Sequence, residues 1–159
     1  MTAAIEIGLN AVIVAVTAEE PRLLAVHRPC EVGSGSELAL PSGPLDPEKD
    51  RTLELALGAW VQGQTGVALG YVEQLYTFGN RFRDPRERQG GARVVSIAYL
   101  ALVREAPLDR AAGASWVNWY DFLPWEDWRG GRPAILEGEI ASGLERWVRA
   151  GEDKSAVRL

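Results

Sequence analysis

Residues Leu40 to Val67 read LPSGPLDPEKDRTLELALGAWVQGQTGV, and this stretch holds the most specific structural signals of the chain. Its first half is rich in proline and other turn-forming residues, which is typical of a loop. Its second half repeats apolar residues at helical spacing, which predicts a helix from Arg51 to Gln64. The apolar stripe of that helix would consist of Leu53, Leu57, Trp60 and Val61. Gly66 follows directly and is a typical helix stop.

Apolar runs on both sides of this stretch predict a sheet. Strands are expected over residues 7–16, 22–27, 38–40, 71–78, 92–103 and 116–119. Residues 29–37 and 79–91 are polar and rich in glycine or proline, so both are expected to be loops. A second helix is expected from Ala134 to Arg149. This order predicts an α/β fold with a mixed sheet between helices, an α/β/α sandwich.

Composition narrows the class of protein. A chain of 159 residues fits a single domain over residues 1–159, and 47% hydrophobic with 25% charged residues is ordinary for a soluble protein. The net charge of −5 argues against nucleic-acid binding by this segment. The single Cys30 suits a reducing compartment, and no secretory leader or membrane-spanning run is evident. We therefore expect a cytoplasmic protein without a membrane partner.

The residues around Gly66 resemble the signature of the Nudix fold family, G-x5-E-x7-R-E-U-x-E-E-x-G-U, in which U is a bulky aliphatic residue. Aligned backward from Gly66, the scaffold positions match. They are Val61, Gly66 and Val67. The carboxylate positions do not match, because the chain carries Trp60, Gly63 and Gln64 there, and Ala59 replaces the arginine.

This difference bears on the chemistry that the resemblance implies. In the intact signature the carboxylates lie on one helix face and converge on divalent cations. Such a metal neutralises a pyrophosphate and activates water. Trp60 offers no oxygen, Gly63 has no side chain and Gln64 is a neutral, weaker ligand. We therefore expect no catalytic residues and no metal or other cofactor, with Mg²⁺ required only if the chain hydrolyses its ligand after all.

The resemblance covers about Ile7 to Val148. Within the family, the chain is most similar to the Nudix-type sensor domains of bacterial transcriptional regulators of NAD metabolism. The stretches that carry it are 51–66, 71–79, 83–86 with 93–102, and 119–125. It implies binding of ADP-ribose or a related nucleotide, followed in such regulators by a winged-helix segment that binds DNA. The chain would then be the N-terminal part of a longer regulator or a stand-alone relative, and it would contact DNA only through a segment absent here. A homodimer is expected on base rate.

A cluster of arginines between residues 81 and 93 is the strongest functional signal. Five arginines and two carboxylates give this segment a net charge of +3. Guanidinium groups bind phosphate oxygens in pairs, so Arg83, Arg86 and Arg93 are expected to hold a pyrophosphate. Further candidate ligand-binding residues are Arg81, Arg28, Phe82 and Tyr99. The alternative is a solvated loop whose arginines pair with surface carboxylates.

Two other groups of residues leave alternatives open. Glu48, Asp50 and Glu54 are the acids near the altered signature, and they would be the catalytic fallback if the chain is an active hydrolase; otherwise they are acids favoured near a helix N-terminus. Aromatic residues crowd the segment 116–128, where they could pack on the core, form a dimer interface or stack on a base.

Three functions remain open from the sequence. The first is a catalytically degenerate domain that senses an NAD-related nucleotide. The second is a magnesium-dependent pyrophosphohydrolase that uses displaced acids. The third is a dimerisation domain with a vestigial site.

Overall fold

The computed structural model describes residues 5–29, 35–108 and 113–152, so Cys30 lies outside the described residues. Contacts group the chain into two compact units, Met1–Val117 and Asn118–Leu159, and each is described by itself. The single domain expected over residues 1–159 stays a prediction. No helix among the described residues has the length and apolar character needed to cross a bilayer.

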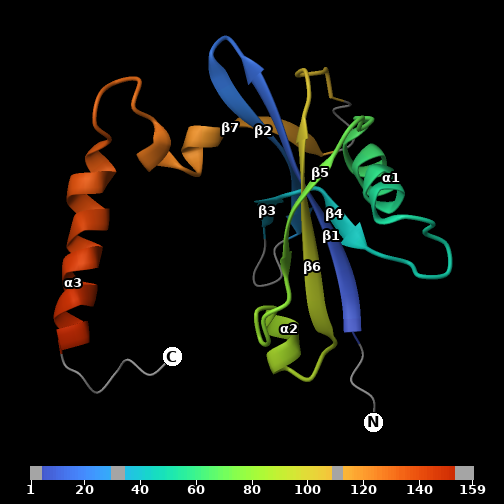
Figure 1. Cartoon of the computed structure of the whole chain (residues 1–159). Coiled ribbons are helices and arrows are strands. Elements are labelled where there is room, and N and C mark those ends of the chain that lie inside the picture. Colours follow the sequence, from blue (N-terminus) through green and yellow to red (C-terminus); the bar gives the residue numbers. More distant parts are fainter. Residues whose placement is uncertain (1–4, 30–34, 109–112, 153–159) are drawn as a thin grey trace. The chain divides into compact units, whose positions relative to one another are not determined.

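The first unit is built on a mixed sheet (Figure 1). Its strands are β1 (Ile5–Thr17), β2 (Glu20–Pro29), β3 (Ser36–Ala39), β4 (Ser42–Pro44), β5 (Glu73–Phe78), β6 (Arg93–Leu102) and β7 (Ala114–Asn118). The main order is β3-β2-β1-β6-β5, with β4 paired to β1 and β7 paired to β2. The long β1 and β6 run parallel, whereas β1 pairs antiparallel with β2 and β4. The mixed sheet and the α/β class expected from the sequence are confirmed.

Helix α1 (Leu53–Thr65) follows its sequence signals closely. The Thr52 hydroxyl caps the helix by accepting the backbone N–H of Leu55 at 3.2 Å. Gly66 ends the helix in the left-handed region with φ of 75°, and its N–H donates to the Gln62 carbonyl at 2.9 Å. Both ends of the helix are therefore fixed within the stretch that carries the family resemblance.

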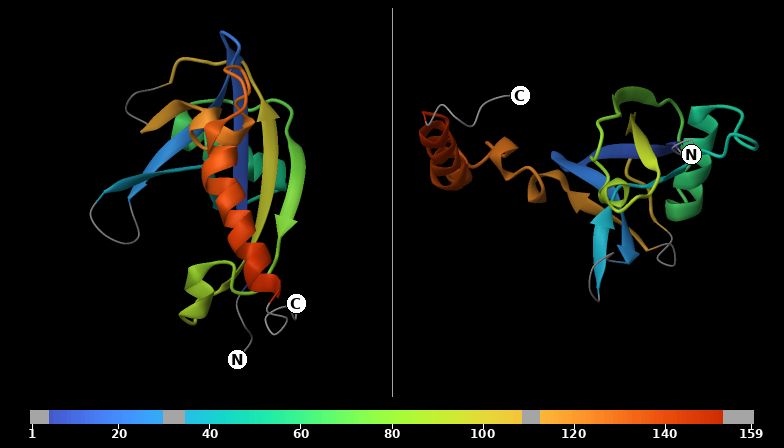
Figure 2. Two further views of the ribbon diagram at one scale, coloured as in Figure 1. Left: turned by 90° about the vertical axis from the view of Figure 1, so that its left-hand side faces the viewer. Right: turned by 90° about the horizontal axis from the view of Figure 1, so that it is seen from below.

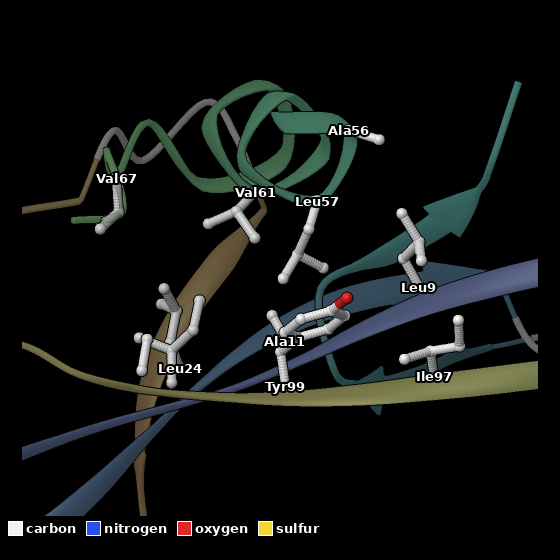
Figure 3. Close-up of a cluster of buried hydrophobic side chains, with 11 residues drawn as sticks. Leu9, Ala11, Leu24, Ala56, Leu57, Val61, Val67, Ile97 and Tyr99 are labelled. Atoms are coloured by element: carbon white, nitrogen blue, oxygen red, sulfur yellow. The ribbon is translucent and has the colours of Figure 1, made fainter. Parts of the chain in front are cut away.

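Helix α1 lies on one face of the sheet (Figure 2), and the hydrophobic core lies between them (Figure 3). Alternate residues of the parallel pair face this helix, because side chains of a strand alternate between the two faces. The buried members are Leu9, Ala11, Ile13, Ile97, Tyr99 and Ala101 from the strands and Ala56, Leu57 and Val61 from α1. Trp60 was expected in the same stripe, but its side chain stays 38% exposed. The apolar stripe of α1 is thus narrower than predicted, and the Trp60 indole can pack against another surface.

Two short elements were missed by the sequence pattern. Residues Ser42–Pro44 form β4 against β1, where a loop was expected. The predicted loop over residues 79–91 contains the one-turn helix α2 (Pro85–Arg88), capped by Asp84, whose carboxylate accepts the Arg86 N–H at 2.8 Å. Both elements are too short to produce a recognisable periodicity.

The second unit holds the end of the aromatic segment and the last helix. Short 3₁₀ turns at Trp119–Asp121 and Pro124–Glu126 precede a π-helical turn at Leu136–Ile140, which leads into α3 (Ala141–Glu152). The expected helix over residues 134–149 therefore exists but begins with a π turn. Within the unit, the Arg129 guanidinium lies 4.6 Å from the ring centre of Tyr120. Trp116 belongs to the first unit and packs partly against its core.

Candidate functional site

A polar pocket of about 420 Å³ opens in the first unit, where β1, β4 and the segment around α2 approach one another. Its wall combines charged, polar and aromatic side chains from six separate stretches of the chain. The members used below are Glu6, Asn10, Arg28, Ser42, Gly43, Trp60, Asp84, Arg86 and Ser96. Its volume falls within the range common for small-molecule sites.

Trp60 packs against β4 at this wall of the pocket. A Cβ placed on Gly43 would overlap the Trp60 ring, so the indole lies directly on the glycine backbone. The indole N–H donates to the Pro44 carbonyl at 3.0 Å. This contact explains why Trp60 leaves the apolar stripe of α1: its ring packs on β4 and lines the pocket.

Gln64 reaches the same strand from the last turn of α1. Its side-chain oxygen accepts the Ser42 N–H at 3.1 Å, and its side-chain nitrogen donates to the Ser42 carbonyl at 2.7 Å. The amide thus pairs with the Ser42 backbone as a neighbouring strand would. Gly63, between the two substituted positions, is exposed and faces open space.

The residues at the signature's carboxylate positions do not fit a divalent cation. Trp60 supplies an indole ring, Gly63 supplies no side chain, and both polar atoms of Gln64 are engaged by Ser42. The nearby acids do not gather either: an Asp50 carboxylate oxygen accepts the Asp46 N–H at 2.7 Å, while Glu48 and Glu54 are exposed. Over residues 5–29, 35–108 and 113–152, no group of three or more histidine, cysteine or acidic side chains could hold a metal.

Arg28 is the cation at the wall beside Ser42. This half-buried guanidinium donates to the Ser42 hydroxyl at 2.6 Å and to the Ser42 carbonyl at 3.2 Å. Both of these partners are neutral oxygens. Within the part of the chain that the structure describes, no carboxylate lies within ion-pair distance of Arg28. The positive charge of Arg28 therefore remains unneutralised by those residues at the edge of the pocket.

The arginines of the segment 81–93 are held differently. The Arg83 guanidinium lies 4.3 Å from the ring centre of Phe78 and donates to the Ser96 hydroxyl at 3.4 Å. Arg93 donates to the Gly79 carbonyl at 2.7 Å. Arg81 lies over the Phe82 ring at 4.9 Å and approaches the Glu87 carboxylate at 3.8 Å. None of these three arginines lines the pocket.

Arg86 does line the pocket, but it is paired with acids. Its guanidinium donates to both carboxylate oxygens of Asp84, at 3.1 and 2.9 Å, and comes within 3.7 Å of Glu6. The hydrogen bond from Arg86 holds the pKa of Asp84 below its ordinary value. Of the three arginines favoured by the sequence, the structure places Arg86 alone at the pocket, and there the charge is already compensated.

The two expected aromatic walls also lie elsewhere. Phe82 is exposed, has a left-handed backbone with φ of 61°, and its N–H donates to the Glu87 carboxylate at 2.6 Å. Tyr99 is 2% exposed within the core, away from the pocket. Burial, and then the charge of Glu54, raise the pKa of the Tyr99 hydroxyl. Trp60 takes the place of an aromatic wall instead.

Several pocket residues were not proposed from the sequence. Glu6, Asn10 and Ser96 project from strands, and their polar character between apolar neighbours of β1 and β6 was the available signal. Ser42 lies in the proline-rich first half of the stretch from Leu40 to Val67, before the aligned signature. Its role becomes visible once Gln64 and Arg28 are seen to meet on it.

Comparison with known proteins supports the fold assignment. No protein-family model and no curated protein matches the sequence. Among solved structures, the Nudix domain of Shewanella oneidensis NrtR complexed with ADP ribose aligns with a TM-score of 0.65 and 25% identity over 92% of this chain and 90% of that chain. A MutT/nudix family protein from Enterococcus faecalis aligns with a TM-score of 0.60 and 26% identity over 74% of this chain and 45% of that chain.

A structure of Shewanella oneidensis NrtR also aligns, with a TM-score of 0.59 and 26% identity over 74% of this chain. The matched region covers 53% of that protein, so the chain spans about half of it. Taken together with the mixed sheet, the helix that ends at Gly66 and the pocket beside it, these likenesses identify the chain as a Nudix-fold protein similar to the Nudix domain of NrtR.

Proposed function

We propose that the first unit binds ADP-ribose or a related NAD-derived nucleotide in the pocket beside Arg28 and acts as a regulatory sensor without hydrolysing it. The observation that carries the proposal is the Arg28 guanidinium, which lines the pocket and is held by two neutral oxygens of Ser42. Arginine is suited to phosphate oxygens because its planar fork donates in parallel pairs.

The rest of the pocket suits the remainder of such a ligand. Glu6, Asn10 and Ser96 offer acceptors and donors for sugar hydroxyls along β1 and β6, and Asn10 pairs with Ser42 at the Arg28 end. Trp60 adds an aromatic surface at the Arg28 end. The structure of the NrtR Nudix domain with ADP ribose supports the same ligand class for this chain.

The donor set described above supports the proposal that hydrolysis is lost. A divalent cation needs oxygen ligands, and the altered helix presents an indole ring, a glycine and an amide that is already bonded on both sides. The positive charge opposite the phosphates would come from Arg28 instead of a metal.

The regulatory part of the proposal extends beyond the described pocket. Shewanella oneidensis NrtR has been solved complexed with a 27mer DNA, and the matched region covers 52% of that chain. A DNA-binding segment outside this chain, a homodimer and a cytoplasmic location therefore belong to the proposal. Sedimentation of the protein with and without ADP-ribose would measure the oligomeric state.

Calorimetric titration with ADP-ribose tests the proposal directly. We expect micromolar binding that is the same in Mg²⁺ and in EDTA. Arg28→Gln should weaken binding by about 1.5–3 kcal/mol, roughly 10- to 150-fold, because a charge-assisted contact is lost. Arg93→Gln is the matched control, since that guanidinium donates to the Gly79 carbonyl away from the pocket. No binding of ADP-ribose, NAD or related nucleotides by the unaltered protein would refute the proposal.

An activity assay of the same protein tests the hydrolase alternative. Magnesium-dependent release of AMP from ADP-ribose at high protein concentration, abolished by Glu54→Gln, would establish an enzyme. We expect no release, because Glu54 is exposed on the first turn of α1 and the neighbouring acids are not gathered around a common point.

A further inference from the structure

Gln64 occupies the position at which the Nudix signature carries the second of its paired glutamates, and in this chain its side chain contacts the backbone of β4. Its amide makes two hydrogen bonds to one residue that is 22 positions earlier, accepting from the Ser42 N–H and donating to the Ser42 carbonyl. These bonds fix the start of β4 against the last turn of α1. Gln64 is half-buried, so water competes weakly for them.

Ser42 is also the residue that holds Arg28. The guanidinium donates to the Ser42 hydroxyl at 2.6 Å and to the same carbonyl oxygen that receives the Gln64 amide, at 3.2 Å. Gln64, Ser42 and Arg28 therefore form a continuous set of hydrogen bonds from the helix to the pocket edge. The geometry of the guanidinium depends on where Gln64 places Ser42.

We infer that Gln64 is a positioning residue for the Arg28 anion site, and that the amide at this position is what keeps the arginine available to a ligand. The inference rests on the proposed function, because it concerns the same pocket. A carboxylate accepts hydrogen bonds but cannot donate them when ionised. At position 64 it would face the Ser42 carbonyl, a second acceptor, and lose that bond.

A carboxylate there would have a second effect. Arg28 shares the Ser42 carbonyl with Gln64, so a negative charge at position 64 would lie close to the guanidinium. Opposite charges in a partly buried site attract strongly, and the arginine would be drawn into an ion pair. The glutamate of the family signature would thus disable this pocket, whereas in an intact signature the same side chain belongs to the metal site.

The test is the variant Gln64→Glu, titrated with ADP-ribose at several salt concentrations. We expect binding roughly tenfold weaker than in the unaltered protein, a size typical of coupled residues in one hydrogen-bond network. We also expect a smaller dependence of affinity on salt, approaching that of Arg28→Gln, since the cation is neutralised within the protein. A disturbance of packing alone would lower affinity and leave the salt dependence unchanged.

Gln62→Glu is the matched control. It makes the same chemical change two residues earlier in α1, at an exposed side chain whose amide donates to the Gly66 carbonyl at 3.1 Å. It adds the same negative charge to the same helix without touching Ser42. We expect its affinity for ADP-ribose to stay within about twofold of the unaltered protein, since isolated surface charges contribute little.

Each outcome separates the inference from the proposed function. If Gln64→Glu binds ADP-ribose as the unaltered protein does, or binds weakly with unchanged salt dependence, the positioning role is refuted while the proposed function stands. If the unaltered protein does not bind, the proposed function fails first. Should circular dichroism show that Gln64→Glu does not fold, Gln64→Ala replaces it: we expect several-fold weaker binding alone and no further loss when it is added to Arg28→Gln. Additive losses would refute the inference.

Discussion

The pocket wall at Arg28 and the arginine-rich segment 81–93 differ in how they hold positive charge. The segment has five arginines. Those at 81, 83 and 93 lie outside the pocket wall and contact aromatic rings, a carboxylate, or carbonyl and hydroxyl oxygens of the loop and the adjacent strand. The pocket wall has Arg28, which is held by a serine. In the segment with the higher density of charge, Arg81 and Arg86 are paired with carboxylates, whereas Arg28 is held by neutral oxygens.

This difference shows that availability of a cation is a property of its contacts. An arginine bonded to a carboxylate, as Arg86 is to Asp84, must give up that contact before it can bind phosphate, which costs part of the binding energy. Arg28 is oriented by neutral acceptors and also lines the pocket, whereas Arg83 and Arg93 have neutral acceptors but lie outside the pocket wall. The pocket wall should therefore control binding, and the segment should control stability of its own loop.

The largest expected effect on stability and binding concerns Gly43. A methyl group at this position would overlap the Trp60 ring, which is tied to the Pro44 carbonyl. We expect Gly43→Ala to lower the free energy of unfolding by about 1–3 kcal/mol through overpacking. ADP-ribose binding should weaken as well, because Trp60 and β4 both line the pocket. Chemical denaturation and calorimetry measure the two effects.

Gly63→Ala provides a control of opposite sign. Gly63 lies in the interior of α1, and a methyl group there would meet open space. Alanine is the better helix former, so the variant should be more stable by about 0.5–1 kcal/mol and bind normally. Equal destabilisation by the two alanines would show that the close contact at Gly43 carries no special weight.

The sequence predicted those parts of the fold that depend on local patterns. The stripe through Leu57 and Val61, the helix stop at Gly66 and the strand predicted from the apolar run over residues 7–16 are visible in the order of residues, and each is confirmed. The three-residue β4 was missed because it exists only through its pairing with β1. Trp60 was assigned to the core because its spacing fits, but its ring lies on a glycine seventeen residues earlier.

The candidate site was harder to predict for the same reason. Arg28, Ser42 and Gln64 are far apart in sequence and share no motif, so their hydrogen bonds could not be foreseen. The arginines of segment 81–93 were predicted to bind phosphate because they are close together in sequence. Closeness in sequence shows where positive charge is dense. It does not show which groups contact each guanidinium, because these groups can come from other elements, as Phe78 of β5 does for Arg83.

The buried hydroxyl of Tyr99 has no hydrogen-bond partner among the described residues. An unsatisfied buried polar group costs free energy, so Tyr99→Phe should raise the free energy of unfolding by about 1 kcal/mol. The residue lies in the core and outside the pocket, and ADP-ribose affinity should not change. Weaker binding by this variant in calorimetry would return Tyr99 to the ligand site and shift the comparison away from Arg28.

Arg83→Gln probes the segment itself. The guanidinium over the Phe78 ring should contribute about 0.5–1 kcal/mol at an exposed site. We expect the variant to lose roughly that much stability in denaturant titration while its affinity for ADP-ribose changes by less than about twofold. A loss of affinity as large as that of Arg28→Gln would contradict the division of roles between the two regions.

The smallest effect concerns the pH dependence of the contact between Asp84 and Arg86. The hydrogen bond from Arg86 lowers the pKa of Asp84 below its ordinary value of 3.8. Because the pKa is lower in the folded chain, this carboxylate contributes stability above its unfolded pKa and loses it as the pH falls through the folded value. Asp84→Asn should therefore flatten the decline in unfolding free energy below about pH 4. Denaturant titrations across that range, with the unaltered protein alongside, measure this effect; an unchanged slope would show that the contact between Asp84 and Arg86 adds no stability to the folded chain.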